Sequence, residues 1–376
     1  MKSKAITEHK KLKGKIEIAL KAPVSSLKDL KIYYTPGVGE VASHIARHKK
    51  DFRELTIKNN SVLIVSDGSA VLGLGNIGPE GALPVMEGKA MLFKQFAGID
   101  AFPIVLGTQD AEEIVKTVKY LSPAFGGINL EDIAAPRCFY IEERLKNELD
   151  IPVMHDDQHG TAIVVLTGLI NAFRVVRKRM KESKIVILGA GAAGNAVAKI
   201  LKKSGARNIL VLDRKGIIAP GRRGLDKYKK ELAKITNPQK IRGELKNAIK
   251  NADAVVGVSG PGLIKPEHVR LMAQKPIVFA LANPIPEILP AEAKKAGAYV
   301  IATGRSDFPN QINNALAFPG VFRGALDNRV RKITDKMKIK AAYAIAGMIG
   351  KPTPQKIIPS IFEKGLAKAV AKAIKV

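Results

Sequence analysis

Short apolar runs alternate with amphipathic stretches along most of the chain. In the first half, apolar runs that end in polar or glycine residues lie at 61–67, 101–107, 126–132 and 151–157. Each of these runs is short enough to form a buried strand. Stretches with helical spacing separate them, at about 84–97, 110–122 and 137–149. Strands that alternate with helices in this way predict a mostly parallel α/β sheet.

The second half repeats this alternation after a long apolar helix at about 160–179. Its expected strands lie at 184–188, 208–213, 252–260, 276–284 and 298–304. We therefore predict an α/β protein with an N-terminal α/β domain, residues 1–158, and a C-terminal Rossmann-type dinucleotide-binding domain, residues 159–376. The long helix between them is the expected hinge.

Both ends of the chain are expected to be helical. The first 30 residues are rich in lysine, and the turn residues of KIYYTPGVGE after them predict a turn before a short helix at about 40–49. From about residue 331 the chain is again expected to be helical, with a break at 351–355.

Composition fits this two-domain interpretation. A chain of 376 residues with 46% hydrophobic residues can bury two cores. Cys138 is the single cysteine, which excludes an intramolecular disulfide, and we expect it to be a small core residue. The first residues contain no apolar signal region, and no window approaches the ~20 apolar residues of a membrane span. We therefore expect a cytoplasmic protein without membrane contact.

The chain is strongly basic. Lys and Arg number 62 against 34 for Asp and Glu, a formal net charge of +28, which raises the question of nucleic-acid binding. The basic residues are spread along stretches such as 174–184 and 214–250, and no zinc-finger or RNP-type motif accompanies them. We therefore favour solvated basic faces, whose field attracts anionic substrates and cofactors, over specific nucleic-acid binding.

The pattern G-x-G-x-x-G occurs twice, and its context separates the two copies. The second copy directly follows the apolar run KIVIL, opens a helix and consists of Gly189, Ala190, Gly191, Ala192, Ala193 and Gly194. In dinucleotide-binding folds the first glycine permits a tight turn, the second lets the pyrophosphate approach, and the third lets helix pack on strand. The helix N-terminus offers free N–H groups to the phosphates. The sequence therefore predicts a dinucleotide site here.

The residues after this motif bear on the choice of cofactor. Asp213 ends the run NILVLD, where an acidic residue is expected to hold the adenosine ribose hydroxyls, and this favours NAD. Arg214 and Lys215 follow at once and can accommodate a 2′-phosphate, which favours NADP. NAD and NADP both stay open.

The first copy consists of Gly73, Gly75 and Gly78. Other residues separate it from its preceding apolar run, and the candidate acid Asp100 precedes a strand instead of ending one. We interpret this copy as a close backbone turn that lines the substrate cleft, and not as a second dinucleotide site.

Two acidic pairs end predicted strands: Glu131-Asp132 and Asp156-Asp157. Carboxyl ends of parallel strands meet at one crevice, where four carboxylates repel one another unless a cation is present. Such hard oxygen ligands suit Mg²⁺ or Mn²⁺. His155 and His159 flank the second pair at zinc-like spacing, but the segment lacks the general base of HExxH and is expected at a strand end. We therefore interpret both histidines as orienting or packing residues.

These features together resemble the malic enzymes, in the compact form common in prokaryotes. The resemblance covers nearly the whole chain and rests on segments at 33–42, 66–104, 126–139, 154–162, 187–201, 279–284 and 311–320. It implies that the N-terminal domain is a malic domain. It also implies metal-dependent oxidative decarboxylation of (S)-malate to pyruvate and CO2 with reduction of NAD(P)⁺, and a homodimer with a tyrosine near the subunit interface.

The resemblance further implies three catalytic residues. Tyr34 matches the proton donor, Lys89 the general base, and Asp156 the acid that pairs with the lysine. A lysine acts as a base near neutral pH only when its pKa is lowered. Burial and a nearby cation lower that pKa, whereas Asp156 opposes them.

The remaining implied residues hold the metal and the substrate. The metal ligands are Glu131, Asp132 and Asp157, and the residues that contact malate or the nicotinamide are Asn283 and Asn314. Larger relatives grip a substrate carboxylate with an arginine near the first glycine turn, and SDGSAVLGLG contains none. We expect the backbone amides of that turn and Ser69 to hold the distal carboxylate instead.

Two alternatives stay open. A malolactic enzyme or a malate dehydrogenase would keep the same nucleotide motif, although we find no His–Asp pair with an arginine clamp of the kind that dehydrogenases stopping at oxaloacetate use. A non-catalytic nucleotide or nucleic-acid binder is the other alternative. The combination of Tyr34, Lys89 and three acidic residues argues against it, because a binder needs no such set.

Overall fold

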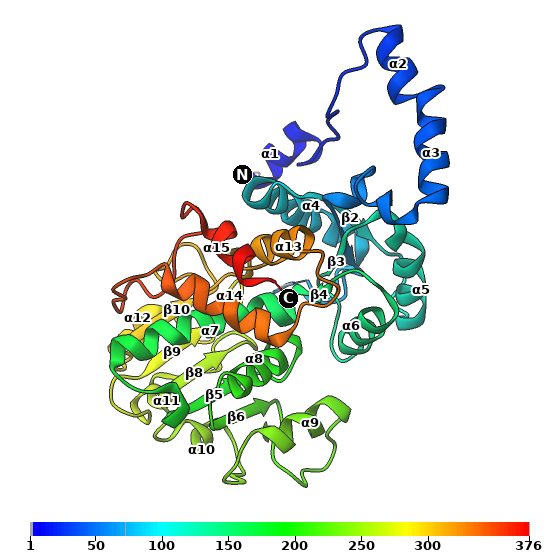
Figure 1. Cartoon of the computed structure of the whole chain (residues 1–376). Coiled ribbons are helices and arrows are strands. Elements are labelled where there is room, and N and C mark those ends of the chain that lie inside the picture. The colour runs from blue at the N-terminus through cyan, green and yellow to red at the C-terminus, as the bar shows by residue number, and fades with distance from the viewer. Residues whose placement is uncertain (1–2, 72, 376) are drawn as a thin grey trace.

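The computed structural model describes residues 3–71 and 73–375 and contains two sheets (Figure 1). The first sheet is wholly parallel, in the order β2-β1-β3-β4. Its strands are β1 (Ser61–Ser66), β2 (Asp100–Val105), β3 (Gly127–Leu130) and β4 (Val153–His155). The chain leaves β1 toward β2 on one side and continues to β3 on the other. The switch point between β1 and β3 is where ligands bind in open α/β sheets.

Helices cover both faces of this sheet. One face packs against α4 (Gly78–Ala97) and α13 (Phe318–Asp327), and the other against α5 (Ala111–Leu121) and α6 (Arg137–Glu148). Helix α4 corresponds to the helix predicted at 84–97, but it begins earlier, at Gly78. Proline is common in the first turn of a helix, and Pro79 marks that turn while Pro84 lies inside the helix.

The second sheet has the order β10-β9-β8-β5-β6-β7 and is parallel except for β7. Its strands are β5 (Lys184–Leu188), β6 (Asn208–Asp213), β7 (Gly216–Ile217), β8 (Ala254–Gly257), β9 (Ile277–Ala280) and β10 (Val300–Thr303). Its switch point lies between β5 and β8, as in a Rossmann-type sheet. The predicted fold class is thus confirmed.

Helices also cover both faces of the second sheet. One face carries α7 (Asp156–Val176) and α8 (Ala192–Lys203), with α9 (Lys227–Ile235) beside α8. The other face packs against α10 (Leu245–Ile249), α11 (Pro266–Arg270) and α12 (Pro290–Lys295). The C-terminal helices α14 (Asp335–Gly347) and α15 (Leu366–Ala373) return to pack on α7 and α13.

Helix α7 lies at the centre of the molecule. One continuous apolar core runs from Ile64 on β1 past Phe93 on α4 and Leu166 on α7 to Ile187 on β5. Among the described residues, α7 is the one helix long and apolar enough to cross a membrane, but 72% of its most apolar window is buried inside the protein. We therefore assign it to the core. The predicted domain boundary near residue 158 falls in its first turn and stays a prediction.

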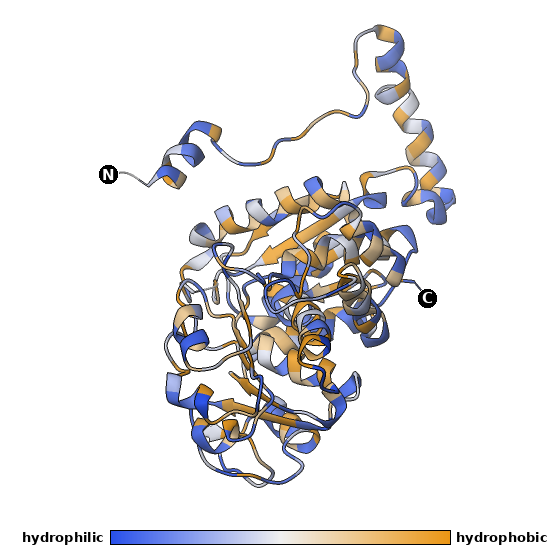
Figure 2. Ribbon diagram, turned by 90° about the vertical axis from the view of Figure 1, so that its left-hand side faces the viewer, coloured by the Kyte–Doolittle hydropathy of each residue, from blue (hydrophilic) through white to orange (hydrophobic). Residues whose placement is uncertain are grey.

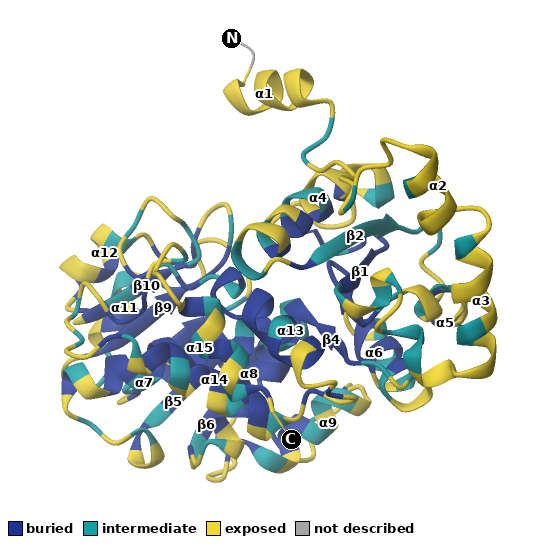
Figure 3. Ribbon diagram, turned by 45° about the horizontal axis from the view of Figure 1, so that its top comes forward, coloured by how far each residue is buried: buried dark blue, intermediate teal, exposed yellow. Residues whose placement is uncertain are grey.

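The N-terminal segment differs from the rest of the chain. Helices α1 (Lys4–Leu12), α2 (Leu27–Tyr33) and α3 (Gly37–Arg47) contain no buried residue and project as an arm from the body (Figures 2 and 3). The expected helix over the first 30 residues is interrupted between α1 and α2, where Gly14 and Pro23 disfavour helix. The 40–49 helix begins instead at Gly37.

Cys138 is buried on α6, as predicted for a small core residue. Burial raises the pKa of its thiol above the usual value. A thiol held in its protonated form is a weak nucleophile, so Cys138 serves packing.

The aromatic cluster between the first sheet and the C-terminal helices yields a stability prediction. Phe93 is fully buried, with ring centroids 4.7 Å from Phe318 and 5.4 Å from Phe322. Phe93→Ala is expected to lower the free energy of unfolding by about 3–5 kcal/mol, because it removes buried surface and leaves a cavity. Urea denaturation measures the loss. Phe362→Ala, at a ring 79% exposed, is the control, and equal losses in both variants would contradict this packing.

Candidate active site

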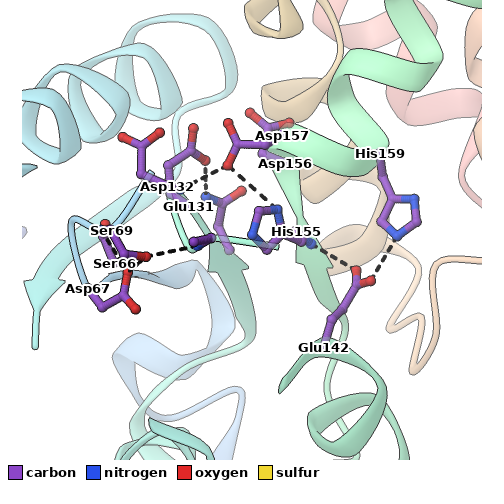
Figure 4. A network of polar contacts seen from close by, with 12 residues as sticks. Ser66, Asp67, Ser69, Glu131, Asp132, Glu142, His155, Asp156, Asp157 and His159 are labelled. Carbon is purple, nitrogen blue, oxygen red and sulfur yellow. Dashed lines mark hydrogen bonds and ion pairs between the residues drawn. The ribbon is translucent and has the colours of Figure 1, made fainter. Parts of the chain in front are cut away.

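Three carboxylates gather at the carboxyl edge of the first sheet (Figure 4). Glu131 and Asp132 follow β3, whereas Asp157 lies in the first turn of α7. One oxygen atom of each lies within 4.8 Å of the others. The backbone N–H of Asp132 donates to Asp157 Oδ2 at 2.8 Å, and Asp132 itself has a φ of +53°, which turns the chain sharply after the strand. The three predicted metal ligands are therefore brought together.

The electrostatics of this cluster fit a cation. Burial raises the pKa of Glu131 well above its usual value; the ammonium of Lys89 opposes this rise, and the other carboxylates add to it. Hard carboxylate oxygens at this spacing are the donors that Mg²⁺ and Mn²⁺ prefer. Within the described chain, this is the one group of His, Cys, Asp or Glu side chains with metal-ligand spacing.

Lys89 reaches this cluster from α4. Its Nζ lies 2.5 Å from both Asp156 Oδ2 and Glu131 Oε1, and 4.4 Å from the centroid of the Phe318 ring. The side chain is only 8% exposed, so the lysine is not a surface residue of the helix. Burial alone would lower the pKa of Lys89, but Asp156, Glu131 and then Asp157 outweigh it and raise the pKa above the usual value. The lowering expected from the sequence is thus not found in the chain alone.

Asp156 is fully buried, and the backbone around it is built to make room. A Cβ at Gly160 would lie 1.8 Å from Asp156 Oδ1 and 3.0 Å from the Cβ of Asn314. Only glycine therefore fits one turn after Asp156. The same approach places Asn314, at the start of the short helix η5 (Asn314–Leu316), beside the lysine–carboxylate pair.

The prediction that the second acidic pair ends a strand was wrong. Strand β4 stops at His155, and Asp156 and Asp157 begin α7, so His159 also lies inside that helix. A short strand that runs directly into an apolar helix leaves no loop between them. Neither histidine belongs to the carboxylate cluster, although His155 Nδ1 lies 3.6 Å from Asp157 Oδ2.

The hydroxyl of Ser69 already makes two hydrogen bonds within the protein. It donates to Asp67 Oδ1 at 2.5 Å and accepts from the N–H of Ala134 at 2.9 Å. Asp67, fully buried, also accepts from the guanidinium of Arg137 at 2.9 Å. This arrangement fixes the loop after β1 to the loop after β3, and it does not favour the expected role of Ser69 as a carboxylate ligand. The Asp67–Arg137 pair was missed, because its two residues lie far apart in the sequence.

The first glycine turn joins the two halves of the cleft. A Cβ at Gly73, which has a φ of +76°, would lie 2.2 Å from the carbonyl oxygen of Asn283. Asn283 precedes a cis proline in the loop after β9. The turn therefore packs against a loop of the second sheet, which fits its interpretation as a close backbone turn.

The second glycine turn has the geometry of a dinucleotide cradle. A Cβ at Gly189 would lie 2.6 Å from Val258 O, and one at Gly194 would lie 1.8 Å from Gly189 O. A Cβ at Gly191, in contrast, would meet nothing within 4 Å. The first and third glycines are thus required by packing, while the second faces open space. This turn lines a cavity of about 530 Å³ together with Asp213.

Asp213 ends β6 in this cavity, as expected, but it already has cationic partners. Its Oδ2 accepts from Arg222 at 2.5 Å and from Lys229 at 3.0 Å. Burial would raise the pKa of Asp213, but these hydrogen bonds hold it at about 2. The sequence predicted only the neighbouring Arg214 and Lys215, which are exposed and also line the cavity. Arg222 and Lys229 lie beyond β7, which folds back on β6, and only this fold brings them to Asp213.

Tyr34 is not brought to this site within one chain. It caps the C-terminal end of α2 on the arm and is 64% exposed. In Figure 1 the arm lies beyond α4 and β2, away from the ends of β3 and β4.

A sheet with a dinucleotide-type glycine turn, together with a buried lysine–carboxylate cluster at the edge of the other sheet, defines a nucleotide-binding α/β enzyme. The chain belongs to the malic enzyme family. Residues 13–146 match the family model of the malic enzyme N-terminal domain, and residues 158–375 match that of the malic enzyme NAD binding domain.

Curated relatives and solved structures agree with this assignment. The chain is 55% identical to an NAD-dependent malic enzyme of Geobacillus stearothermophilus, over 96% of this chain and 76% of the relative. It is 54% identical to a bifunctional malic/malolactic enzyme of Bacillus subtilis, over 100% of this chain and 92% of the relative. The crystal structure of the NAD-dependent malic enzyme of Thermotoga maritima superposes with a TM-score of 0.96 at 49% identity, covering 99% of both chains.

The predicted family, the oxidative decarboxylation of malate and the class of NAD- or NADP-dependent malic enzyme are thereby confirmed. The non-catalytic binder is disfavoured. Relatives named for NAD and relatives named for NADP both match the chain, so the comparisons leave the cofactor preference open.

The glycine turn yields a prediction that separates packing from ligand contact. Gly194→Ala is expected to lower the thermal unfolding temperature and abolish NADH binding, because its methyl group collides with the Gly189 carbonyl. Gly191→Ala should keep the unfolding temperature and still weaken NADH binding, because the methyl group enters the space left for a phosphate. Thermal unfolding and NADH fluorescence titration measure both effects. A Gly194→Ala protein that binds NADH like the wild type would contradict the assignment.

Proposed function

We propose that this chain converts (S)-malate to pyruvate and CO2 with Lys89 as the general base beside a divalent cation held by Glu131, Asp132 and Asp157. One observation carries the proposal: a buried ammonium lies 2.5 Å from a carboxylate of the cluster and equally close to Asp156. Stability alone does not explain why a lysine is buried among these acids, because replacing a buried ion pair with apolar side chains often leaves a protein equally stable. A catalytic role does explain it.

The roles of the chain's own groups follow from this geometry. A bound Mg²⁺ or Mn²⁺ would lower the pKa of the malate hydroxyl and stabilise negative charge on its oxygen during loss of CO2. The charge of that cation would also lower the pKa of Lys89, so that the lysine loses its extra proton. The neutral amine of Lys89 then takes the proton of the C2 hydroxyl as a hydride leaves C2 for the nicotinamide. Asp156 keeps the lysine directed at that position. Asn283 and Asn314, whose loops meet at this cleft, orient malate and the nicotinamide end.

Protonation of C3 requires an acid that one chain does not place in the cleft. Tyr34 matches the family's proton donor, yet it stands on an exposed arm. We propose that two chains form a homodimer in which the arm of each chain lies on the other and brings Tyr34 to the partner's site. The exposed apolar residues of the arm support this arrangement, among them Ile18, 89% exposed, and Leu27, 76% exposed. Unpartnered apolar surface of this kind marks an interaction site.

For the cofactor we propose NAD, because Asp213 lies where a carboxylate accepts from the ribose hydroxyls. Arg222 and Lys229 offset its charge, so NADP is expected as a slower second substrate. We also propose a cytoplasmic location, because the reaction needs both malate and a nicotinamide cofactor and both are available there.

A direct assay tests the reaction and the base together. Wild-type protein with malate and Mn²⁺ should reduce NAD and release pyruvate, with NADP measured in parallel by absorbance at 340 nm. Lys89→Ala should lower kcat about 10²–10⁴-fold, because the general base is lost, and should leave NADH affinity nearly unchanged. Lys94→Ala, at an exposed lysine of the same helix, is the matched control. Undiminished turnover by Lys89→Ala would remove the lysine from the mechanism.

Mixed dimers test whether Tyr34 acts on the partner. Lys89→Ala and Tyr34→Phe chains should each have little activity alone. When they are co-expressed, a mixed dimer contains one site with an intact lysine and an intact partner tyrosine and one site with neither, so isolated mixed dimers should regain roughly half of wild-type activity per chain. The recovered activity is read from pyruvate formation after separation of differently tagged dimers. If Tyr34 serves its own chain, mixing restores nothing.

A malolactic reaction is the second candidate function. One of the matching relatives is named a bifunctional malic/malolactic enzyme. In such a reaction pyruvate is reduced to lactate by the NADH formed at the same site, with no net change in cofactor. Quantifying lactate and pyruvate in the assay separates the two: lactate formation without accumulation of NADH supports the malolactic reaction.

A further inference from the structure

A buried charged cluster lies behind the metal-ligand carboxylates, on the side of β4 that faces α6. It joins Glu142 and Lys146 on α6, His159 on α7, and Lys338 on α14. Glu142 is 5% exposed and Lys338 is 3% exposed. None of these residues has a role in the reaction proposed above. Burying charged side chains costs free energy, so their burial here needs an explanation.

The hydrogen bonds of Glu142 provide one. Strand β4 is an edge strand, so its outward N–H groups find no partner strand. Glu142 Oε1 accepts from the backbone N–H of His155 at 2.9 Å (Figure 4). His155 is the last residue of β4, directly before Asp156 and Asp157. A side chain of α6 therefore fixes the end of β4, two residues before the metal-ligand candidate Asp157.

The second oxygen of Glu142 extends this hold to the C-terminal helices. Lys338 Nζ, which can only donate, lies 3.0 Å from His159 Nδ1. The other ring nitrogen, Nε2, lies 3.0 Å from Glu142 Oε2 and, at a longer 3.3 Å, from Lys146 Nζ. We therefore assign the ring hydrogen to Nε2, which donates it to Glu142 Oε2, while Nδ1 accepts from Lys338. Lys338 also donates to Asp335 at 3.1 Å. One carboxylate thus ties α6 to the end of β4 and, through one imidazole, to α14.

We infer that Glu142 is a positioning residue for the metal site, which holds Asp157 in the direction that ligates the cation. The inference rests on the proposed metal site and adds a residue that touches neither metal nor malate. Groups behind a metal site fix the orientation of its ligands, and their loss weakens metal binding without removing any ligand. Lys146, 2.6 Å from Glu142 Oε1, balances the buried charge on the same helix.

The test measures metal affinity directly, on the full chain without malate or cofactor. Free Mn²⁺ is quantified by electron paramagnetic resonance in titrations of wild type, Glu142→Gln and Glu143→Gln, the last being an exposed glutamate on the same helix. Glu142→Gln should raise the Mn²⁺ dissociation constant about tenfold. Glutamine has one oxygen in place of two, so its NH2 group, which only donates, would face either the His155 N–H or the His159 N–H. Glu143→Gln should bind like wild type. The kcat of Glu142→Gln should recover at saturating Mn²⁺ while its KM for Mn²⁺ stays raised.

A second pair of variants keeps the test decisive if Glu142→Gln folds poorly. His159→Gln can still donate to Glu142 and accept from Lys338, so it should keep wild-type Mn²⁺ affinity. His159→Ala breaks both bonds and should weaken Mn²⁺ binding. A purely structural role predicts a different pattern: lower urea midpoints, with unchanged Mn²⁺ affinity in the folded proteins. That pattern would overturn the positioning role of Glu142 and leave the proposed metal site standing. A wild-type chain that binds no Mn²⁺ would instead overturn the metal site itself.

Discussion

Repulsion among buried carboxylates is the constraint on which the rest of this structure depends. Glu131, Asp132 and Asp157 lie close enough together that their charges cannot all persist without compensation. Lys89 supplies part of it at 2.5 Å from Glu131, and Asp156 shares the same ammonium. In the proposed function, a site held in this way is preorganised for a divalent cation. Its charge balance comes from a helix that is remote in sequence from both acidic pairs.

The architecture explains how these groups meet. Each sheet has a switch point where neighbouring loops diverge. The cavity at the glycine turn of the second sheet is also lined by Ala135, Pro136 and Phe139, which follow β3 of the first sheet. Helix α7 starts at the carboxylate cluster and continues through the common core, so the site stands on one of the most buried elements of the fold. The glycine turn at Gly73, pressed against the Asn283 backbone, closes the contact between the two halves. Rigid placement of this kind is what proximity and orientation require in catalysis.

The N-terminal arm, unlike the rest of the chain, is not stabilised by burial in its own chain. Its helices bury no residue in their own chain, and Tyr34 at the end of α2 is the proton donor in the proposed reaction. An exposed apolar segment gains stability from contact with a second copy, and a homodimer supplies that contact by symmetry. In this proposal the dimer completes the site, which would link assembly to activity.

The sequence by itself determined the elements and the family. Apolar periodicity gave the order of the strands along the chain, and the G-x-G-x-x-G turn with Asp213 identified the nucleotide-binding sheet, because these signals depend on neighbours in the chain. It also identified the acidic pairs from their place after predicted strands, whereas Lys89 was identified only through resemblance to a known family. Tertiary structure decided the rest: that Asp156 begins a helix, that Ser69 is already engaged, that Arg222 and Lys229 meet Asp213, and that Tyr34 stands apart from Lys89. The N–H of Ala134 reaches Ser69 from the loop after β3, Arg222 and Lys229 reach Asp213 from beyond β7, and the position of Tyr34 depends on how the arm leaves the body. No local pattern in the sequence records such contacts.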